Sequence, residues 1–167
     1  MASQISFHAK KSAVQIDFVA PKFNVVVKGD KKMHFIEKHG WIMIQMAMGD
    51  NKEYDWSEKL TFALSLADLP HIYKSFIDYR SKKGFNLSLV HDPNAGTDQK
   101  GKLVKTLRIQ EGQNAGTFAL TINYKSDGQD KRAFHYLNLG ELKMLENYLN
   151  DMPSLMSGAN FLASETA

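Results

Sequence analysis

Residues 59–84 read KLTFALSLADLPHIYKSFIDYRSKKG, and the spacing of their apolar residues changes part-way along. The first part alternates apolar and polar residues, which is typical of a half-buried β-strand, at Leu60, Phe62, Leu64 and Leu66. The second part has apolar residues at helical spacing, at Leu69, Ile72, Tyr73, Phe76 and Ile77. Pro70 suits the first turn of that helix, and residues 81–84 suit its end. The stretch therefore predicts a strand followed by an amphipathic helix.

The same order of patterns occurs on both sides of this stretch. Before it, strand patterns cover residues 4–16 (as one long strand or as two with a bulge), 23–28, 32–37 and 41–48. After it, they cover 85–90, 102–110, 117–124 and 131–137, and a second helical pattern covers 140–150. Strands dominate, and the long crossovers of parallel sheets are missing. We therefore expect an α+β fold in which each half packs a helix against antiparallel sheet.

Composition limits the class of protein. The chain has 167 residues, 43% of them hydrophobic, which is enough for one domain with its own core. It has no cysteine, so disulfides and thiolate metal sites are excluded. The N-terminus lacks an apolar leader, and no run reaches the roughly 18 apolar residues of a membrane span. We therefore expect one domain over residues 1–167 that does not enter a membrane and works in the cytoplasm of a bacterial or phage-infected cell.

Motifs of catalysis and cofactor binding are missing. The chain has neither G-x-x-x-x-G-K-[ST] nor G-x-G-x-x-G, so no phosphate-binding loop is indicated. Its six histidines are scattered rather than grouped as metal ligands, and the H-D-P at 91–93 is typical of a turn after a strand. We expect no enzyme, no cofactor and no metal.

The small net charge of +3 hides an uneven distribution. Between residues 10 and 38 there are seven lysines and three acids, and between residues 100 and 110 there are four basic residues and no acid. Both clusters fall on predicted strands and turns, and aromatic residues accompany the first. Lysines neutralise phosphates and aromatic rings stack on bases, so this combination favours binding of single-stranded nucleic acid. Charged strand edges also prevent aggregation, which is the alternative explanation for the lysines.

Several segments resemble the Whirly family, in the same order along the chain. Residues 54–66, YDWSEKLTFALSL, resemble the family pattern Y-D-W-S-x-K-x-x-F-x-L-S-x. The H-D-P at 91–93 and GKLVKTL at 101–107 resemble its H-D-P … G-K-V-x-K-x-L segment. FALTI at 118–122 and MPSL at 152–155 resemble its F-x-L-S-V and L-P-x-L.

The resemblance implies a fold and a function. The fold would be two antiparallel four-stranded sheets packed crosswise, with a helix after each sheet, in a homo-oligomer (a dimer or a tetramer). The function would be sequence-nonspecific binding of single-stranded DNA, which protects or organises unwound DNA in replication, recombination or transcription. At the place of the family's DNA-binding signature K-G-K-A-A-L-S, the chain has KKSAVQ at 10–15. Lys11, Ala13 and Val14 fit that signature, whereas its glycine and its final serine have no counterpart.

The residues that we expect to bind nucleic acid form three groups. Contacts with the phosphate backbone are expected from Lys10, Lys11, Lys22, Lys28, Lys31 and Lys32. Stacking on bases is expected from Tyr54 and Trp56, although Trp56 has the alternative role of a wedge between the sheets. Contacts of second rank are expected from Lys59, Lys102, Lys105 and Arg108. Trp41, inside an apolar run, is expected in the core, with stacking on bases as the alternative.

Two other functions remain open at this point. One is an RNA-binding protein that anneals complementary strands, and the other is a homo-oligomeric interaction module without nucleic-acid activity. Residues 150–167 continue the apolar pattern of the last helix with Met152, Leu155, Met156 and Phe161. We expect this C-terminal segment to pack at a subunit interface, with packing inside the same subunit as the alternative.

Overall fold

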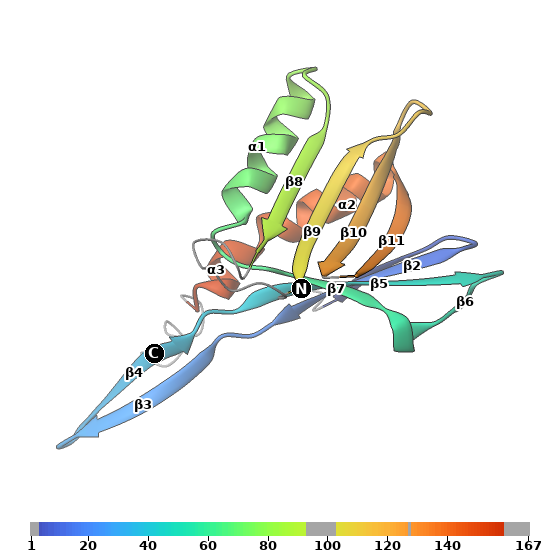
Figure 1. Ribbon diagram of the computed structural model, residues 1–167. Helices are drawn as coiled ribbons and strands as arrows, with labels where there is room; N and C mark the ends of the chain where they lie inside the picture. The colour runs from blue at the N-terminus through green and yellow to red at the C-terminus, as the bar shows by residue number, and fades with distance from the viewer. Residues whose placement is uncertain (1–3, 93–102, 127, 159–167) are drawn as a thin grey trace.

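A computed structural model describes residues 4–92, 103–126 and 128–158 and contains two sheets and a projecting hairpin (Figure 1). The first sheet has the order β1-β2-β5-β6, and β7 also pairs with β5. Its strands are β1 (Gln4–His8), β2 (Ser12–Val19), β5 (Trp41–Asp50), the short β6 (Glu53–Tyr54) and β7 (Leu60–Leu64). The second sheet has the order β11-β10-β9-β8. Its strands are β8 (Asn86–His91), β9 (Val104–Glu111), β10 (Thr117–Ser126) and β11 (Gln129–Asn138). All pairings are antiparallel.

The first sheet differs from the expected four-stranded sheet. It has five strands, and β3 (Lys22–Lys28) and β4 (Lys31–Lys38) leave it to form a separate two-stranded sheet. The hydrogen bonds between the two strands stop at Pro21 and Gly40, which lie side by side. Pro21 has no N–H to donate, and the N–H of Gly40 donates instead to the carbonyl oxygen of Met156 at 2.9 Å. A Cβ on Gly40 would lie 2.8 Å from the carbonyl oxygen of Val19, so the bend also requires a glycine. The β3–β4 hairpin, called the arm below, extends from the body beyond this bend.

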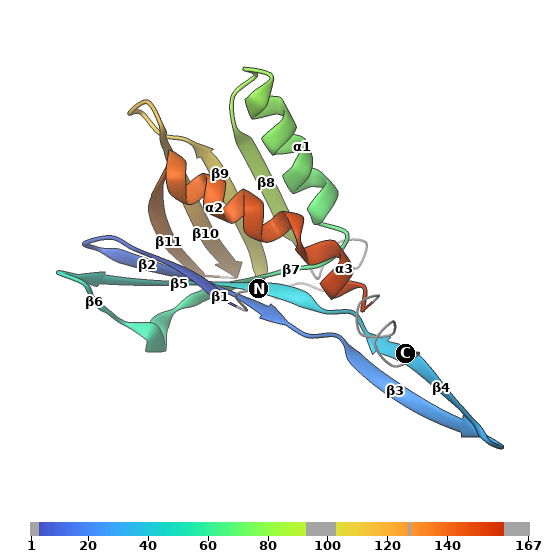
Figure 2. The ribbon, with the colours of Figure 1, turned by 180° about the vertical axis from the view of Figure 1, so that it is seen from behind.

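Both helices pack on the inner face of the second sheet. They are α1 (Leu69–Arg80), which follows the first sheet, and α2 (Leu139–Asn150), which follows the second. Figure 2 shows them in front of β8–β11, and the strands of the two sheets cross at a steep angle in both views. Asn138 and Glu141 form a capping box at the start of α2, which fixes where β11 ends and the helix begins. The α+β class is confirmed.

One hydrophobic core serves both sheets and both helices. Burial alternates along the strands, so Ile42, Ile44 and Met46 of β5 point inward and their neighbours do not. The buried side chains of both sheets and of α1 and α2 form a single connected cluster. The sequence shows this alternation at residues 60–66 but not in the unbroken apolar run of β5, and the alternation leaves one face of each sheet outside the core.

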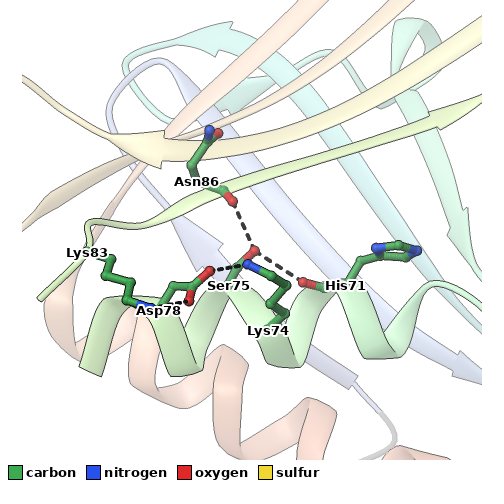
Figure 3. A network of polar contacts seen from close by, with 6 residues as sticks. All are labelled: His71, Lys74, Ser75, Asp78, Lys83 and Asn86. Atoms are coloured by element: carbon green, nitrogen blue, oxygen red, sulfur yellow. Dashed lines mark hydrogen bonds and ion pairs between the residues drawn. The ribbon is translucent and has the colours of Figure 1, made fainter. Parts of the chain in front are cut away.

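Polar contacts join α1 to β8 (Figure 3). The buried Ser75 hydroxyl lies 3.0 Å from the carbonyl oxygen of Asn86 on β8 and 3.2 Å from that of His71 on α1. Near the end of the helix, Asp78 pairs with Lys74 at 2.5 Å and with Lys83 at 3.9 Å. The hydrogen bond from Lys74 holds the pKa of the Asp78 carboxyl below its usual value.

The helix α3 (Met152–Met156) packs on its own chain. Met152 and Met156 are buried in the core cluster described above, so this part of the C-terminal segment already has its apolar side chains covered within one subunit. A contact of the segment with another subunit stays a prediction, and residues 159–167 lie outside the described part of the chain. None of the helices in the described residues is long and apolar enough to cross a membrane.

The Tyr124 hydroxyl joins the two sheets at the free edge of β7. It lies 2.6 Å from the backbone nitrogen of Thr61, 2.6 Å from its carbonyl oxygen and 2.9 Å from its side-chain oxygen. Within residues 4–92, 103–126 and 128–158, β7 pairs with β5 alone, so Tyr124 provides partners for backbone groups that no further strand there occupies.

His135 makes a second junction between the sheets. Its side chain on β11 is 1% exposed, and its Nδ1 lies 3.0 Å from the hydroxyl of Ser12 on β2. The other ring nitrogen, Nε2, is buried and has no hydrogen-bond partner among the described residues. Burial lowers the pKa of His135 below 6.5, although the charge of Glu141 acts in the opposite direction.

This lowered pKa predicts a loss of stability in mild acid. At a pH between the folded and the unfolded pKa of His135, the unfolded chain binds a proton that the folded chain does not. The contribution of neutral His135 to the free energy of unfolding is therefore complete above about pH 6.5 and declines as the pH falls. The free energy of unfolding should decrease by up to about 1.4 kcal/mol per pH unit in that range. Urea unfolding between pH 5 and pH 8 measures it.

His135→Gln should reduce this slope, because glutamine does not titrate. His39→Gln, at an exposed position, is the matched control and should keep the wild-type slope. Equal slopes in the two variants would show that His135 is not the titrating group.

Candidate nucleic-acid interface

The first sheet has an open face on the side away from the core. Its side chains come from alternate positions of β2, β5 and β7 and are half-buried: Gln15, Asp17, Trp41, Met43, Gln45, Thr61 and Ala63. Near its middle, the Asp17 carboxylate accepts hydrogen bonds from the side-chain amides of Gln15 at 2.9 Å and Gln45 at 2.7 Å. This open face offers apolar surface and amide groups, which suit the faces and edges of bases.

A lysine corner lies at one end of the open face, where two turns are joined. The backbone N–H of Gly49 donates to the carbonyl oxygen of Lys11 at 2.9 Å, and that of Lys52 donates to the carbonyl oxygen of Lys10 at 3.0 Å. The Tyr54 hydroxyl donates to the carbonyl oxygen of Ala9 at 2.6 Å. The side chains of Lys10, Lys11 and Lys52, which define the corner, are exposed and form no ion pair within the described residues. Three lysine side chains from two joined turns therefore remain available to phosphates.

The arm lies at the other end of the open face. β5 runs from the base of the arm to β6 beside the corner (Figure 1). The four predicted lysines of the arm are exposed: Lys22, Lys28, Lys31 and Lys32. Of these, Lys22 pairs with Glu37 at 2.9 Å. The arm also exposes apolar side chains, among them Phe35 at 49% and Val26 at 45%, so it combines charge with surfaces for stacking.

Trp41 is not a core residue, contrary to expectation. It is half-buried on the open face, where the Lys38 Nζ lies 4.2 Å from the centre of its ring. The alternation of β5 explains the difference, because the neighbouring Ile42 takes the inward position and Trp41 must point the other way. Trp41 thus lies between the arm and the open face.

Two of the second-rank residues flank a cleft between the sheets. Lys59 lines this cleft of about 310 Å³, together with Leu103, Tyr124 and Lys131. The Lys105 Nζ lies 4.7 Å from the centre of the Tyr124 ring. Lys131 at the same cleft is paired with Glu58 at 2.8 Å.

The other two second-rank residues do not join these groups. Arg108 lies on the outer face of the second sheet, because it is three positions from Lys105 on β9 and therefore points to the opposite side. Lys102 lies outside the described residues. The predicted residues are therefore distributed over the corner, the arm, the cleft and the second sheet, and the open face connects the first two.

Comparison with known protein families finds a match over most of the chain. The model of the Whirly transcription factor family matches residues 7–147. The chain belongs to the Whirly family.

Whirly relatives are similar over most of this chain. The chloroplastic single-stranded DNA-binding protein WHY1 of Solanum tuberosum is 26% identical over 155 residues, which cover 90% of this chain and 53% of that protein. The protein of the same name from Zea mays is 24% identical over 163 residues, which cover 95% of this chain and 58% of that protein. This chain thus spans little more than half the length of these curated relatives.

Solved structures of Whirly proteins show the same fold. WHY1 from Arabidopsis thaliana has a TM-score of 0.81 at 20% identity, over 98% of this chain and 89% of that one. The plant transcriptional regulator PBF-2 has a TM-score of 0.82 at 19% identity, over 98% of this chain and 87% of that one.

The Whirly-like motifs have structural roles in this chain. In Y-D-W-S, the Asp55 carboxylate accepts hydrogen bonds from the Ser57 hydroxyl and from the backbone of Ser57 and Glu58, and so caps the short 3-10 helix Trp56–Glu58. These hydrogen bonds lower the pKa of Asp55. In H-D-P, the His91 Nε2 lies 3.2 Å from the carboxylate of Asp68 just before α1.

The two predicted stacking residues, Tyr54 and Trp56, lie beside the lysine corner and at the start of the 3-10 helix. Tyr54 uses its hydroxyl to hold the corner and its ring to contact His8, with 5.6 Å between ring centres. Trp56 is half-buried at the start of the 3-10 helix. Base stacking by either residue stays a prediction.

The turn at the Whirly signature does not require the missing glycine. Within the described residues, neither Lys10 nor Lys11 has a positive φ, so the turn before β2 accepts side chains at both positions. A lysine in place of glycine therefore adds a charge to the corner without backbone strain.

Sequence reasoning missed Lys52, the third lysine of the corner. The strand pattern at 41–48 is followed by the turn residues Gly49, Asp50 and Asn51, but nothing in the sequence showed that the next residue, Lys52, would meet Lys10. Asn51 and Lys52 have φ values of 49° and 70°, so both lie in the left-handed region. Asparagine tolerates this conformation, whereas lysine costs about 1–2 kcal/mol there. Strain of this kind persists only where the surrounding structure holds it, and here the backbone N–H of Lys52 donates to the carbonyl oxygen of Lys10.

Replacing Lys52 by glycine should stabilise the fold and at the same time weaken the binding of single strands. Lys52→Gly should raise the free energy of unfolding by roughly 1 kcal/mol, because glycine adopts a positive φ without strain. If Lys52 contacts a phosphate, the same change should reduce the salt slope of single-strand binding by about 0.7. Urea unfolding and fluorescence anisotropy measure the two effects.

Asn51→Gly is the matched control, because it relaxes the same turn and keeps the lysine. It should leave the salt slope at the wild-type value. A wild-type slope in Lys52→Gly as well would exclude Lys52 from the interface.

Proposed function

We propose that this Whirly chain binds single-stranded DNA with little sequence preference, without catalysing a reaction. One observation carries the proposal. Unpaired lysines at the corner and lysines on the arm lie at the two ends of the open face, which has apolar and amide side chains. The names of the chloroplastic relatives, which are single-stranded DNA-binding proteins, support it.

The proposed mode of binding uses charge at the ends and stacking between them. Phosphates lie along the lysines of the corner and the arm, where they release counterions. Bases lie against the open face near Trp41 and against Phe35 of the arm, and stacking contributes about 1–3 kcal/mol per base. Duplex DNA hides its base faces, so single strands bind more tightly. The cellular role would be to protect or organise unwound DNA in replication, recombination or transcription, in the cytoplasm.

Fluorescence anisotropy with labelled single-stranded DNA, duplex DNA and RNA across a salt series tests the function. Single-stranded DNA should bind most tightly. The double variant Lys10→Ala, Lys11→Ala should lower the salt slope by about 0.7 for each of the two lysines that binds a phosphate.

The double variant Lys82→Ala, Lys83→Ala removes two adjacent exposed lysines at the end of α1 and is the matched control. Its slope should equal that of the wild type. Equal affinity for duplex and single strand would reject the proposal. Tighter binding of RNA would favour the annealing protein, and no binding at low salt would favour the interaction module.

We also propose that the chain forms a homo-oligomer through its helices. Ile77 on α1 is 54% exposed, and Leu139 and Met144 on α2 are 52% and 53% exposed. Exposed apolar side chains on two neighbouring helices favour burial against another subunit.

The double variant Ile77→Glu, Met144→Glu should therefore lower the molar mass in solution, measured by light scattering after size exclusion. Val27→Glu places a charge at an exposed position of the arm and is the control. If this control dissociates the oligomer and the helix variant does not, the arm rather than the helices forms the contact.

A further inference from the structure

One side-chain contact joins the lysine corner to the second sheet. Ser12 begins β2 directly after Lys10 and Lys11, and its hydroxyl lies 3.0 Å from the Nδ1 of His135 on β11. Both side chains are buried, with Ser12 4% and His135 1% exposed. The contact therefore connects an exposed turn of the first sheet to the interior behind the second.

The backbone of the corner depends on the position of Ser12. The carbonyl oxygen of Ser12 accepts a hydrogen bond from the backbone N–H of Ala9 at 2.9 Å, which closes the turn that carries Lys10 and Lys11. The carbonyl oxygen of Lys10 in turn accepts a hydrogen bond from the backbone N–H of Lys52 at 3.0 Å. A displacement of Ser12 therefore moves all three lysines of the corner, because these hydrogen bonds join them in one unit.

The surroundings of His135 suit a neutral ring. A neutral imidazole has one N–H and one nitrogen that accepts, whereas the protonated ring has two N–H donors and a positive charge. Nδ1 faces the Ser12 hydroxyl, and the buried Nε2 has no hydrogen-bond partner among the described residues. A proton on the ring thus places a charge and an unpaired donor in the interior, which costs free energy.

Two titratable groups act on this ring from neighbouring elements. Glu141 on α2 favours the charged form, and His8 on β1 opposes it. The Glu141 carboxylate is held at the start of α2, where it accepts the backbone N–H of Asn138 at 2.8 Å, and it leaves Nε2 without a partner. β10 places the apolar Leu120 opposite His135, and the inward side chains of β5 are apolar as well. A protonated ring is therefore relieved by opening the contact with Ser12, which admits water.

We propose that the contact between Ser12 and His135 is a proton-sensitive lock on the lysine corner. With a neutral ring the contact is closed, and the three lysines are held in place. With a protonated ring the contact opens, and the corner binds single strands less tightly. The inference rests on the proposed function, because it concerns the regulation of that same interface.

Exposed histidines near the interface have the opposite effect. His8 and His39 are exposed, and a proton on either adds positive charge, which strengthens the attraction to phosphates. Titration of these residues therefore tightens binding in mild acid, whereas the lock weakens it. The direction of the pH dependence distinguishes the two.

Fluorescence anisotropy with a labelled oligothymidine between pH 5 and pH 8, at constant ionic strength, tests the lock. Thymine has no group that titrates in this range. The affinity of the wild type should fall as the pH drops below about 6.5, by up to about tenfold per pH unit, because the closed contact excludes one proton. Circular dichroism at each pH restricts the comparison to conditions in which the chain stays folded.

Three variants assign the effect to the contact. His135→Gln removes the titrating group, so its affinity should not fall in acid. Ser12→Ala removes the contact at every pH, so its affinity at pH 8 should already be lower than that of the wild type. His8→Gln is the matched control, because it removes an exposed histidine that acts on the same ring, and it should keep the wild-type decline.

Four results would overturn the inference. They are a wild-type affinity that stays constant or rises in acid, a wild-type affinity of Ser12→Ala at pH 8, a decline that persists in His135→Gln, and a decline that disappears in His8→Gln. No binding by the wild type at pH 8 would instead reject the proposed function, which keeps the two failures distinct.

Discussion

The two sheets share one core, and this constraint determines where each surface lies. Each strand alternates, so a sheet that buries one face in a common core must present the other face outward. The first sheet presents its open face, and the second presents Phe134, Tyr136 and Arg108. Helices cover only the inner side of the second sheet. An outward face on each sheet is thus a consequence of how the core is built.

The spacing of apolar residues, every second residue for strands and about every 3.6 residues for helices, was sufficient to predict the longer strands, the two long helices and the α+β class. It did not predict which strands share a sheet, because the separation of the arm depends on hydrogen bonds of Gly40 and on the missing N–H of Pro21. The short β6 and the 3-10 helix were also missed, since each is too short for a periodic pattern, and α3 was indicated only by the resemblance of residues 152–155 to the family. Trp41 was misplaced because an unbroken apolar run conceals which of its residues face inward.

The candidate interface was predictable in composition but not in arrangement. Charge clusters identified Lys10 and Lys11, yet the contact of their turn with Lys52 depends on tertiary hydrogen bonds that no local pattern encodes. Lys105 and Arg108 appeared as one cluster, although an odd spacing on a strand sends them to opposite faces.

The contact of Tyr124 with Thr61 affects how the protein behaves at high concentration. An unoccupied strand edge is the template on which sheets of different molecules join into aggregates. At Thr61 the hydroxyl of Tyr124 already occupies the N–H and the carbonyl oxygen of β7, so a strand from another molecule finds this position taken. A side chain from the second sheet thus prevents a further strand from pairing with β7 of the first sheet at this position. It thereby hinders edge-to-edge aggregation of the protein at high concentration.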